Sequence, residues 1–453
     1  MRIGVRPVFK RCRNPATMRH SRPLFIGLLV CSAVVARADW PDFRGPWANG
    51  HASAPGDTNR IGLPMHWSET ENVKWKTPIP FRGWSTPVIL GNQIWLTTAT
   101  EDGHDFFAIC ADVGTGKIIF NERLFHCEKP EPLGNALNGY ASPSAVIEPG
   151  RVYVHFGSYG TACLDTRDFK VLWRRDDVPC LHFRGPGSSP VLFKDLLILT
   201  MDGIDMQYLI ALDRRTGKTV WKTDRTANWN DLDSNGKPRG GGDFRKGFST
   251  PFIIDVGGAA QMFSVSSKAA YSNDPLTGRE LWKIGHGDHS PAARPVFDRG
   301  MVYMACGGGN CGMLALRVDG QGDLADTNYV WRATRAAPKM PSPLLVHGML
   351  FMVNDGGVAT CLDAANGKEY WQERVGSEFS ASLLYGDGRV YSFDRDGKTT
   401  VFRPARTFEV LATNRLADGF MASPAVSGKA LILRTRTHLY RIEEGAKLTT
   451  LAD

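Results

Sequence analysis

The sequence lacks long hydrophobic runs, and beyond its first 38 residues it lacks an excess of charge of either sign. The apolar stretch at residues 24–36 is too short for a confident membrane span. Of the 54 Lys and Arg residues, eight lie in residues 1–38, which leaves 46 against 46 Asp and Glu residues in the remainder. We therefore expect no transmembrane segment beyond residue 38 and no nucleic-acid partner.

Residues 1–38 contain no Asp or Glu and have the features of a secretory signal peptide. Basic residues precede the apolar stretch, and residues 36–38 read Ala-Arg-Ala, a small-residue cleavage site directly before Asp39. Met18 is an alternative start that would give a leader of ordinary length. A lipidated cysteine follows a small residue, and Val30 is too large for that position, so we do not expect Cys31 to be lipidated. We expect an exported protein, either periplasmic or secreted.

What the chain does contain is a repeated hairpin. Its clearest copy, residues 209–221, has a β-rich run that ends at Asp213, a Thr-Gly-Lys turn and a second strand that ends at Trp221. Asp213 can accept hydrogen bonds from turn amides, and Gly217 supplies the positive φ that closes the turn. Val220 and Trp221 suit a half-buried strand. The pattern predicts a β-hairpin.

The hairpin recurs with a constant spacing of eight residues from the Asp to the closing aromatic residue. The copies are Asp112 to Phe120, Asp165 to Trp173, Asp213 to Trp221, Asp274 to Trp282 and Asp363 to Trp371. A Ser-Pro or Ser-Thr-Pro marker precedes each unit. The markers lie at residues 85–87, 142–143, 189–190, 249–251, 342–343 and 423–424, with degenerate copies at 294–295 and 381–382. Four strands per unit and eight markers predict an all-β, eight-bladed β-propeller over residues 73–443.

The two ends of the chain are predicted to complete one blade together. The last unit has no Trp-bearing fourth strand, whereas residues 72–76 read as an orphan outer strand before the first marker. Pairing the two would close the ring and remove an exposed sheet edge. The alternative is an N-terminal extension that packs elsewhere. Residues 39–72 then form an N-terminal segment, and residues 444–453 form a C-terminal tail.

The repeats and the Trp-Pro-Asp-Phe-Arg-Gly opening at residues 40–45 resemble a known superfamily. They are similar to the pyrroloquinoline-quinone (PQQ) type propellers, which include quinoprotein alcohol dehydrogenases, BamB-type outer-membrane assembly factors and exported PQQ-like repeat proteins. The resemblance covers roughly residues 40–442. It implies the fold, but a fold hosts many functions.

The resemblance implies for the enzymes a PQQ held over the propeller axis by Ca²⁺, with an Asp general base, a stacking Trp and two adjacent cysteines. This chain contains no Cys-Cys pair, and we match no Asp constellation to the catalytic one. We therefore predict a non-catalytic binding or scaffold propeller with no cofactor and no catalytic residue. The alternatives are a PQQ- and Ca²⁺-dependent oxidoreductase with a divergent site and a BamB-like assembly factor.

The loops before the markers converge near the axis on one face, so they are the best candidates for a partner or ligand surface. The candidate residues are Arg82, Trp84, Tyr140, His182, Arg184, Arg245, Phe248, His289, Arg294, Phe379 and Phe420. Aromatic faces with Arg and His suit a small polar or anionic ligand, or a protein. The alternative is that these side chains plug the channel as ordinary core. We expect a monomer.

Seven cysteines lie beyond the leader, so at least one stays unpaired within the chain. Cys127 and Cys180 each follow the closing aromatic residue of neighbouring repeats by seven residues, which makes them a candidate disulfide in an exported protein. Cys306 and Cys311 could instead close a local loop. The remaining three, Cys110, Cys163 and Cys361, occupy equivalent strand positions and are expected to be buried thiols.

Two polar clusters contain side chains that can bind metal ions. Residues 286–289, His-Gly-Asp-His, carry suitable ligands, but with no third ligand in view a solvated polar loop is the preferred interpretation. Residues 319–323 resemble the start of a calcium loop but lack its closing Glu, which favours an extended turn. We predict no metal site.

Overall fold

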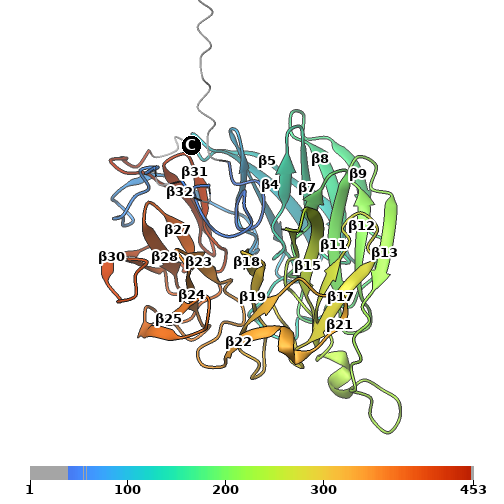
Figure 1. Ribbon diagram of the computed structural model, residues 1–453. Coiled ribbons are helices and arrows are strands. Elements are labelled where there is room, and N and C mark those ends of the chain that lie inside the picture. Colours follow the sequence, from blue (N-terminus) through green and yellow to red (C-terminus); the bar gives the residue numbers. More distant parts are fainter. Residues whose placement is uncertain (1–38, 55, 58, 450–453) are drawn as a thin grey trace, which may run out of the picture. The chain divides into compact units, whose positions relative to one another are not determined.

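The computed structural model describes residues 39–54, 56–57 and 59–449, and these form a ring of eight β-sheets (Figure 1). Each sheet is one blade of four antiparallel strands, with blade 4 carrying a fifth. The predicted all-β, eight-bladed propeller is confirmed. The predicted signal peptide lies outside the described residues. Within the described residues, no helix is long and apolar enough to cross a membrane.

The strands follow the chain from the innermost to the outermost position of each blade. Blade 1 contains β2 (Val88–Leu90), β3 (Gln93–Ala99), β4 (Asp105–Asp112) and β5 (Ile118–His126), and blade 2 contains β6 (Val146–Glu148), β7 (Arg151–His155), β8 (Thr161–Asp165) and β9 (Val171–Arg175). Blade 3 contains β10 (Val191–Phe193), β11 (Leu196–Asp202), β12 (Gln207–Asp213) and β13 (Thr219–Asp224), and blade 4 contains β14 (Phe252–Val256), β15 (Ala259–Val265), β16 (Ala269–Asn273) and β17 (Glu280–Gly285).

The second half of the ring repeats this order. Blade 5 contains β18 (Val296–Asp298), β19 (Met301–Ala305), β20 (Met313–Arg317) and β22 (Tyr329–Ala333), and blade 6 contains β23 (Leu344–Val346), β24 (Met349–Val353), β25 (Val358–Asp363) and β26 (Glu369–Arg374). Blade 7 contains β27 (Leu384–Gly386), β28 (Arg389–Phe393), β29 (Lys398–Phe402) and β30 (Val410–Arg415), and blade 8 contains β31 (Ala425–Ser427), β32 (Ala430–Arg434), β33 (His438–Ile442) and β1 (Val73–Pro78).

The burial of the strands explains their composition. Middle strands such as β24 are buried along their whole length, because each lies between two neighbouring blades and needs apolar side chains on both faces. Outer strands such as β13 expose most of their residues and bury chiefly the Trp. Two excursions leave this plan. A loop with the short helix η1 (Arg239–Gly242) projects from the ring between β13 and β14 (Figure 1, lower right).

The second excursion lies within blade 5. Residues 319–323 enter an extended connection in which β21 (Gly322–Leu324) pairs in parallel with β17 of blade 4, followed by the short helix η2 (Asp326–Asn328). The extended turn expected there is what the structure contains.

Blade 8 closes the ring as predicted. Strand β1 pairs antiparallel with β33, with Trp75 opposite Arg441. The Glu443 amide donates to the Asn72 carbonyl at 2.8 Å, and Trp75 is almost fully buried. The N-terminal strand therefore supplies the missing outer strand of the last blade, and it covers an edge that would otherwise be open.

The repeated Gly and Trp are explained by contacts between neighbouring blades. The Trp173 indole of blade 2 donates to the Arg214 carbonyl in the turn of blade 3 at 3.0 Å, and Gly217 of that turn packs on the indole face. The equivalent pairs are Trp75 with Gly116, Trp221 with Gly278 and Trp331 with Gly367. Each Gly has a positive φ and no room for a side chain, so the turn serves both the hairpin and the joint between blades.

One joint varies on both sides at once. Blade 1 ends in Phe120 instead of Trp, and the turn of blade 2 has Phe169, at φ 60°, in place of the Gly. The two rings stack with centroids 5.1 Å apart. Phe120 is smaller than Trp, and the Phe169 ring fills the space that remains, as close packing of the interior requires.

Substitution of Gly217 by Val is expected to lower the free energy of unfolding by about 2–4 kcal/mol. The cost combines a strained positive φ in a β-branched residue with overpacking, because a Cβ at this position would lie 2.7 Å from Cε3 of Trp173. Urea unfolding followed by Trp fluorescence measures the effect. Gly236→Val is the matched control, since Gly236 also has a positive φ (71°) but a Cβ would meet nothing within 4 Å. Equal effects of the two substitutions would contradict the packing role.

A belt of hydroxyl groups links the inner strands around the axis. The amide of Thr86 donates to Ser144 Oγ, that of Ser144 to Ser189 Oγ, and that of Ser189 to Thr250 Oγ1, at 2.8–2.9 Å. On the other side the amides of Arg294, Ser342 and Ser382 donate to the hydroxyls of Ser342, Ser382 and Ser423. The Ser-Pro markers are thus inter-blade joints. In blade 2 the joining hydroxyl belongs to Ser144, after the proline rather than before it.

The Trp-Pro-Asp-Phe-Arg opening crosses the central channel, and we call residues 40–44 the strap. Trp40 bridges to Ile89 in blade 1, and the Pro41 carbonyl accepts from the Ile147 amide in blade 2. At its far end the buried Arg44 guanidinium donates to carbonyls of Leu383 and Pro343, which precede the inner strands of blades 7 and 6. Because blades 6 and 7 lie across the ring from blades 1 and 2, the strap closes the channel.

Arg294 completes this anchorage. It stands where other blades have the marker hydroxyl, and its guanidinium donates to the Asp42 carboxylate at 3.1 Å and to the Pro251 carbonyl at 2.9 Å. Burial, together with the nearby Arg294 charge, lowers the pKa of Arg44 to about 9. The degenerate marker of blade 5 is therefore the strap's docking point.

Candidate functional site

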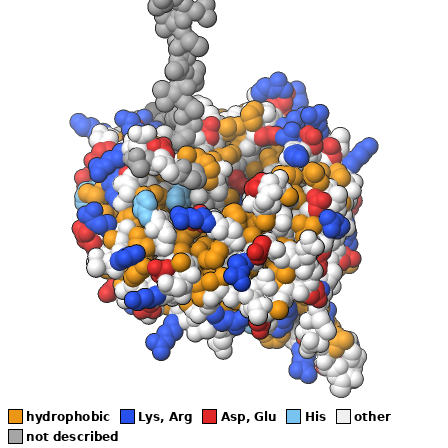
Figure 2. Space-filling view, in the orientation of Figure 1, with side chains coloured by type: hydrophobic (Ala, Val, Ile, Leu, Met, Phe, Trp, Pro, Cys, Tyr) orange, Lys and Arg blue, Asp and Glu red, His pale blue; other side chains and the backbone are white. Residues whose placement is uncertain are grey.

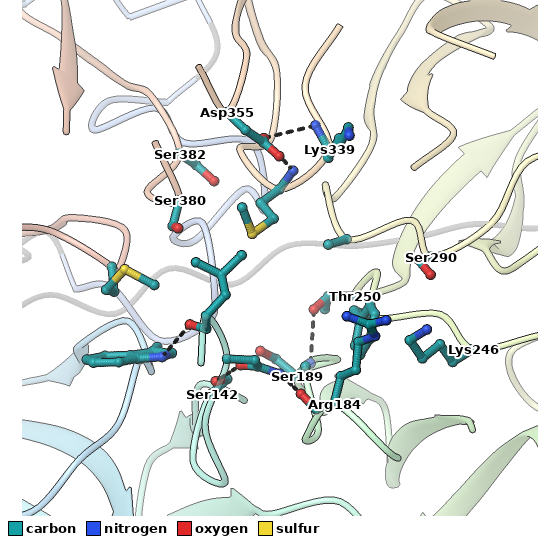
Figure 3. A pocket seen from close by; sticks show the side chains of 18 of the residues that line it. Ser142, Arg184, Ser189, Lys246, Thr250, Ser290, Lys339, Asp355, Ser380 and Ser382 are labelled. Atoms are coloured by element: carbon teal, nitrogen blue, oxygen red, sulfur yellow. Dashed lines mark hydrogen bonds between the residues drawn. The ribbon is translucent and has the colours of Figure 1, made fainter. Parts of the chain in front are cut away.

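The channel above the strap forms a blind cavity of about 540 Å³ on the axis, within the range of small-ligand sites. Phe43 of the strap and the marker hydroxyls line its depth, and the inter-blade loops line its mouth. Figure 3 shows Lys339 and Asp355 across the cavity from Arg184 and Lys246. We call this space the axial cavity.

The charged groups of the axial cavity leave it electropositive. Asp243 accepts two hydrogen bonds from Arg184, at 3.1 and 2.8 Å, and forms an ion pair with Lys246. Asp243 therefore balances Arg184, while burial and the neighbouring Arg184 charge lower the pKa of Lys246 to about 7, so that Lys246 carries only part of a charge at neutral pH. Asp355 accepts the amides of Lys339 and Met340 at 3.1 and 3.2 Å, and burial raises its pKa. The Lys339 side chain adds a further cation at the mouth.

Aromatic side chains form the apolar walls. Trp84 donates its indole N–H to the Leu137 carbonyl at 3.2 Å, and the Arg82 guanidinium lies 5.0 Å from its ring centroid. Phe248 and Phe43 line the cavity as well. The His289 ring lies at the mouth, edge-on to Phe244. Flat apolar walls with basic groups on two opposite sides suit a planar or aliphatic anion.

The structure divides the predicted loop residues into two groups. Trp84, Arg184, Phe248 and His289 line the axial cavity, and Arg82 lies in an adjoining groove that shares Trp84. The second group is buried, so the prediction that these side chains form a binding surface is wrong and the alternative, ordinary core, holds. Its members are Tyr140, His182, Arg294, Phe379 and Phe420. Arg245 is held by Asp231 at 2.9 and 2.6 Å, outside the cavity lining.

Several cavity residues were missed by sequence reasoning. Phe43 lies in a segment that sequence alone does not place on the axis, and Lys339 and Asp355 come from different loops of blades 5 and 6. Lys246 could have been found, because it lies in the same pre-marker loop as Arg245 and Phe248. The Ser-Pro pattern predicts the start of a strand, but it does not predict that the hydroxyl groups line the cavity.

The predicted Cys127–Cys180 disulfide is wrong, because both are free thiols. Cys180 is buried with Tyr153 and Trp173 between blades 2 and 3, whereas Cys127 packs against the cluster between blades 1 and 2. The wall of blade 2 separates them. The disulfide joins Cys306 to Cys311, which was the local alternative. The other three, Cys110, Cys163 and Cys361, are buried free thiols as expected.

The prediction of a solvated loop at residues 286–289 is also wrong. His286 and Asp288 are both buried. The Asp288 carboxylate accepts the amides of Gly309 and Cys311 at 2.7 and 2.9 Å. Polar side chains are buried here because they fix the disulfide loop, a role that composition alone does not reveal.

The axial cavity does not fit a Ca²⁺-bound quinone. The Asp243 carboxylate is paired with Arg184 and Lys246, and the Asp355 carboxylate accepts two backbone amides. The Asn138 amide is also committed, since its nitrogen donates to the Arg184 carbonyl and its oxygen accepts from Ser142. Ca²⁺ requires six to eight oxygen ligands, and these groups already have other partners. We derive no step through this cofactor.

The ring of eight four-stranded blades, the Trp–Gly joints and the axial cavity define a PQQ-like propeller. The family model described as outer membrane protein assembly factor BamB matches residues 75–230 and 205–446. The chain therefore belongs to this family of PQQ-repeat propellers. No curated protein matches the sequence.

Solved structures with the same fold include both assembly factors and enzymes. BamB from Moraxella catarrhalis has 10% identity and a TM-score of 0.55, covering 82% of this chain and 99% of that one. Quinohemoprotein alcohol dehydrogenase from Comamonas testosteroni has 13% identity and a TM-score of 0.63, covering 92% and 82%. A europium-containing methanol dehydrogenase has 11% identity and a TM-score of 0.62, covering 90% of each. At these identities the likeness shows the fold alone.

Proposed function

We propose that this protein is a non-catalytic binding propeller that acts outside the cytoplasm as a monomer and takes a carboxylate-bearing ligand in its axial cavity. The observation that carries the proposal is the blind, electropositive cavity. It has Phe43 as its floor, Trp84 and Phe248 as apolar walls and Lys339 at its mouth. Since the strap closes the other end, a ligand enters from the loop face only.

A ligand carboxylate is expected to meet Arg184 on one side of the cavity or Lys339 on the other, while the apolar part of the ligand packs on the aromatic walls. Charge-assisted hydrogen bonds to Arg and Lys are the strong contacts in such a site. The carboxylate can belong to a small molecule or to an acidic side chain of a partner protein.

Replacement of Lys339 by Glu is expected to weaken carboxylate binding by roughly 3- to 10-fold, because it reverses one exposed charge at the mouth. Trimellitate, an aromatic tricarboxylate, serves as the probe, and quenching of Trp fluorescence gives its affinity. Lys218→Glu is the matched control, since this exposed lysine lies in the outer turn of blade 3. Equal affinities of the wild type and Lys339→Glu, or equal losses in both variants, would overturn the proposal.

The family description favours a second candidate, a role in outer-membrane protein assembly. Exposed apolar side chains support a protein partner: Leu181 and Phe244, on cavity-forming loops, are 47% and 40% exposed, and Met206, on the β11–β12 loop, is 43% exposed. Under this function an acidic segment of the partner would occupy the axial cavity. A synthetic acidic peptide that competes with trimellitate would favour this candidate over a small-molecule ligand.

A further inference from the structure

A second chemical site lies beside the axial cavity, at the Cys306–Cys311 loop. The two sulfurs and one ring nitrogen of His286 all lie within 4.8 Å of one another. Among the described residues this is the one group of three metal-ligating side chains found this close together. All three are buried, with exposed fractions of 0%, 7% and 7%. The intervening residues are Gly-Gly-Gly-Asn, which leave the loop short and without bulky side chains.

The loop is held in place by hydrogen bonds that do not depend on the sulfur–sulfur bond. Asp288 accepts the amides of Gly309 and Cys311, the Gly308 amide donates to the His289 carbonyl at 2.7 Å, and the Cys306 amide donates to the Gly312 carbonyl at 3.2 Å. Cleavage of the disulfide would therefore leave both sulfurs close to His286.

The imidazole is oriented to provide a ligand. Its Nε2 contacts the Ser266 carbonyl at 3.0 Å, and its Nδ1 contacts the Asp288 amide at 3.1 Å. A carbonyl only accepts and an amide only donates, so Nε2 carries the proton and Nδ1 carries the lone pair. The Nδ1 lone pair accepts the Asp288 amide, so a cation bound at Nδ1 would replace this one hydrogen bond without a change of tautomer, while the Ser266 carbonyl keeps the ring in place.

We propose that the reduced form of this loop binds one Cu(I) ion through Cys306, Cys311 and His286. Two thiolates and an imidazole form a soft donor set, which favours Cu(I). Structural Zn²⁺ sites need four protein ligands, and the group supplies three. A dithiol reductant must first deliver two electrons and two protons to the disulfide, and it becomes a disulfide itself. Cu(I) binding then releases the two thiol protons.

The test compares copper retention by the purified protein before and after reduction by a dithiol, which is removed under anaerobic conditions. Cu(I) is offered as its bicinchoninate complex. The reduced wild type is expected to withdraw one more equivalent of Cu(I) than the oxidised protein or a reduced Cys306→Ser/Cys311→Ser variant. His286→Gln should weaken this binding by roughly 10- to 100-fold. Cys127→Ser, which removes the half-buried free thiol, should have no effect.

X-ray absorption of the reduced, loaded wild type gives a readout that does not depend on how the variants fold. Two sulfur ligands and one nitrogen ligand are expected around copper. Copper retained equally by the oxidised protein or by the double serine variant would overturn the proposal. So would an all-sulfur environment, or retention of Zn²⁺ with no retention of Cu(I).

Discussion

Lowering the pH from 7 to 5 is expected to destabilise the propeller by several kcal/mol, because the folded protein holds several buried histidines in their neutral form. Burial lowers the pKa of His155 to about 3 and that of His51 and His182 to about 4. In the unfolded chain these groups titrate near pH 6.5. Below that pH the unfolded state takes up protons that the folded state does not, so stability is lost as the pH falls from 6.5 toward 4.

Each such histidine contributes up to about 1.4 kcal/mol per pH unit in this window, or about 2 kcal/mol at pH 5. Burial raises the pKa of Asp42, Glu131 and Asp355, which bind protons more readily in the folded state and offset part of the loss. The contribution of a histidine to the pH dependence of stability is therefore best isolated by substitution. Removal of one imidazole removes its share of the pH dependence and leaves the carboxyl terms in place.

The measurement is urea unfolding of the wild type and of His155→Gln at pH 7 and pH 5. The His155 ring lies within 2.8 Å of the Thr161 hydroxyl, a contact that the glutamine amide can replace. The variant should lose about 2 kcal/mol less than the wild type between the two pH values. Identical losses in the two proteins would mean that His155 is not held neutral by its surroundings.

The largest expected effect of a single substitution is at Asp202. Its side chain is fully buried and accepts two hydrogen bonds from Arg225, at 3.1 and 3.0 Å. Arg225 also donates to Ser264 Oγ at 2.7 Å and lies over the Tyr271 ring, so the pair joins blade 3 to blade 4. Asp202→Ala would leave a guanidinium buried without a counter-charge. We expect a loss of about 3–5 kcal/mol.

The double variant Asp202→Ala/Arg225→Met is the control, because it removes the stranded charge together with its partner. Replacement of both members of a buried pair by apolar groups costs much less than breaking the pair. The double variant should therefore be more stable than Asp202→Ala in urea unfolding. A single variant within 1 kcal/mol of the wild type would show that Arg225 finds another partner or reaches solvent.

The repeating part of the fold could be predicted from sequence, because hairpin turns and closing aromatic residues obey local rules. Asp213 and Gly217 define their turn within a few residues, and the orphan strand at residues 72–76 was recognised because one blade lacked its outer strand. The joint between Phe120 and Phe169 could not be predicted in the same way, since its partners belong to different blades.

The site was harder to predict, because it depends on where distant segments meet. Trp84 and Arg184 were found from their position before a marker, but Phe43 reaches the cavity only because Arg44 and Arg294 anchor the strap across the ring. Side chains of the same type also differ in burial. Phe248 lines the cavity while Phe379 and Phe420 lie in the core. Spacing places a residue on a loop but does not decide on which side of that loop it lies.

The most direct test of a non-catalytic axial cavity is a titration of the purified protein with PQQ, with and without Ca²⁺, together with an assay of dye-linked alcohol oxidation. PQQ is a tricarboxylate, so the electropositive cavity predicts saturable quenching of Trp fluorescence that does not require Ca²⁺, is weakened by Lys339→Glu and is accompanied by no turnover. Binding that requires Ca²⁺ and supports alcohol oxidation would contradict the account and establish a quinoprotein dehydrogenase.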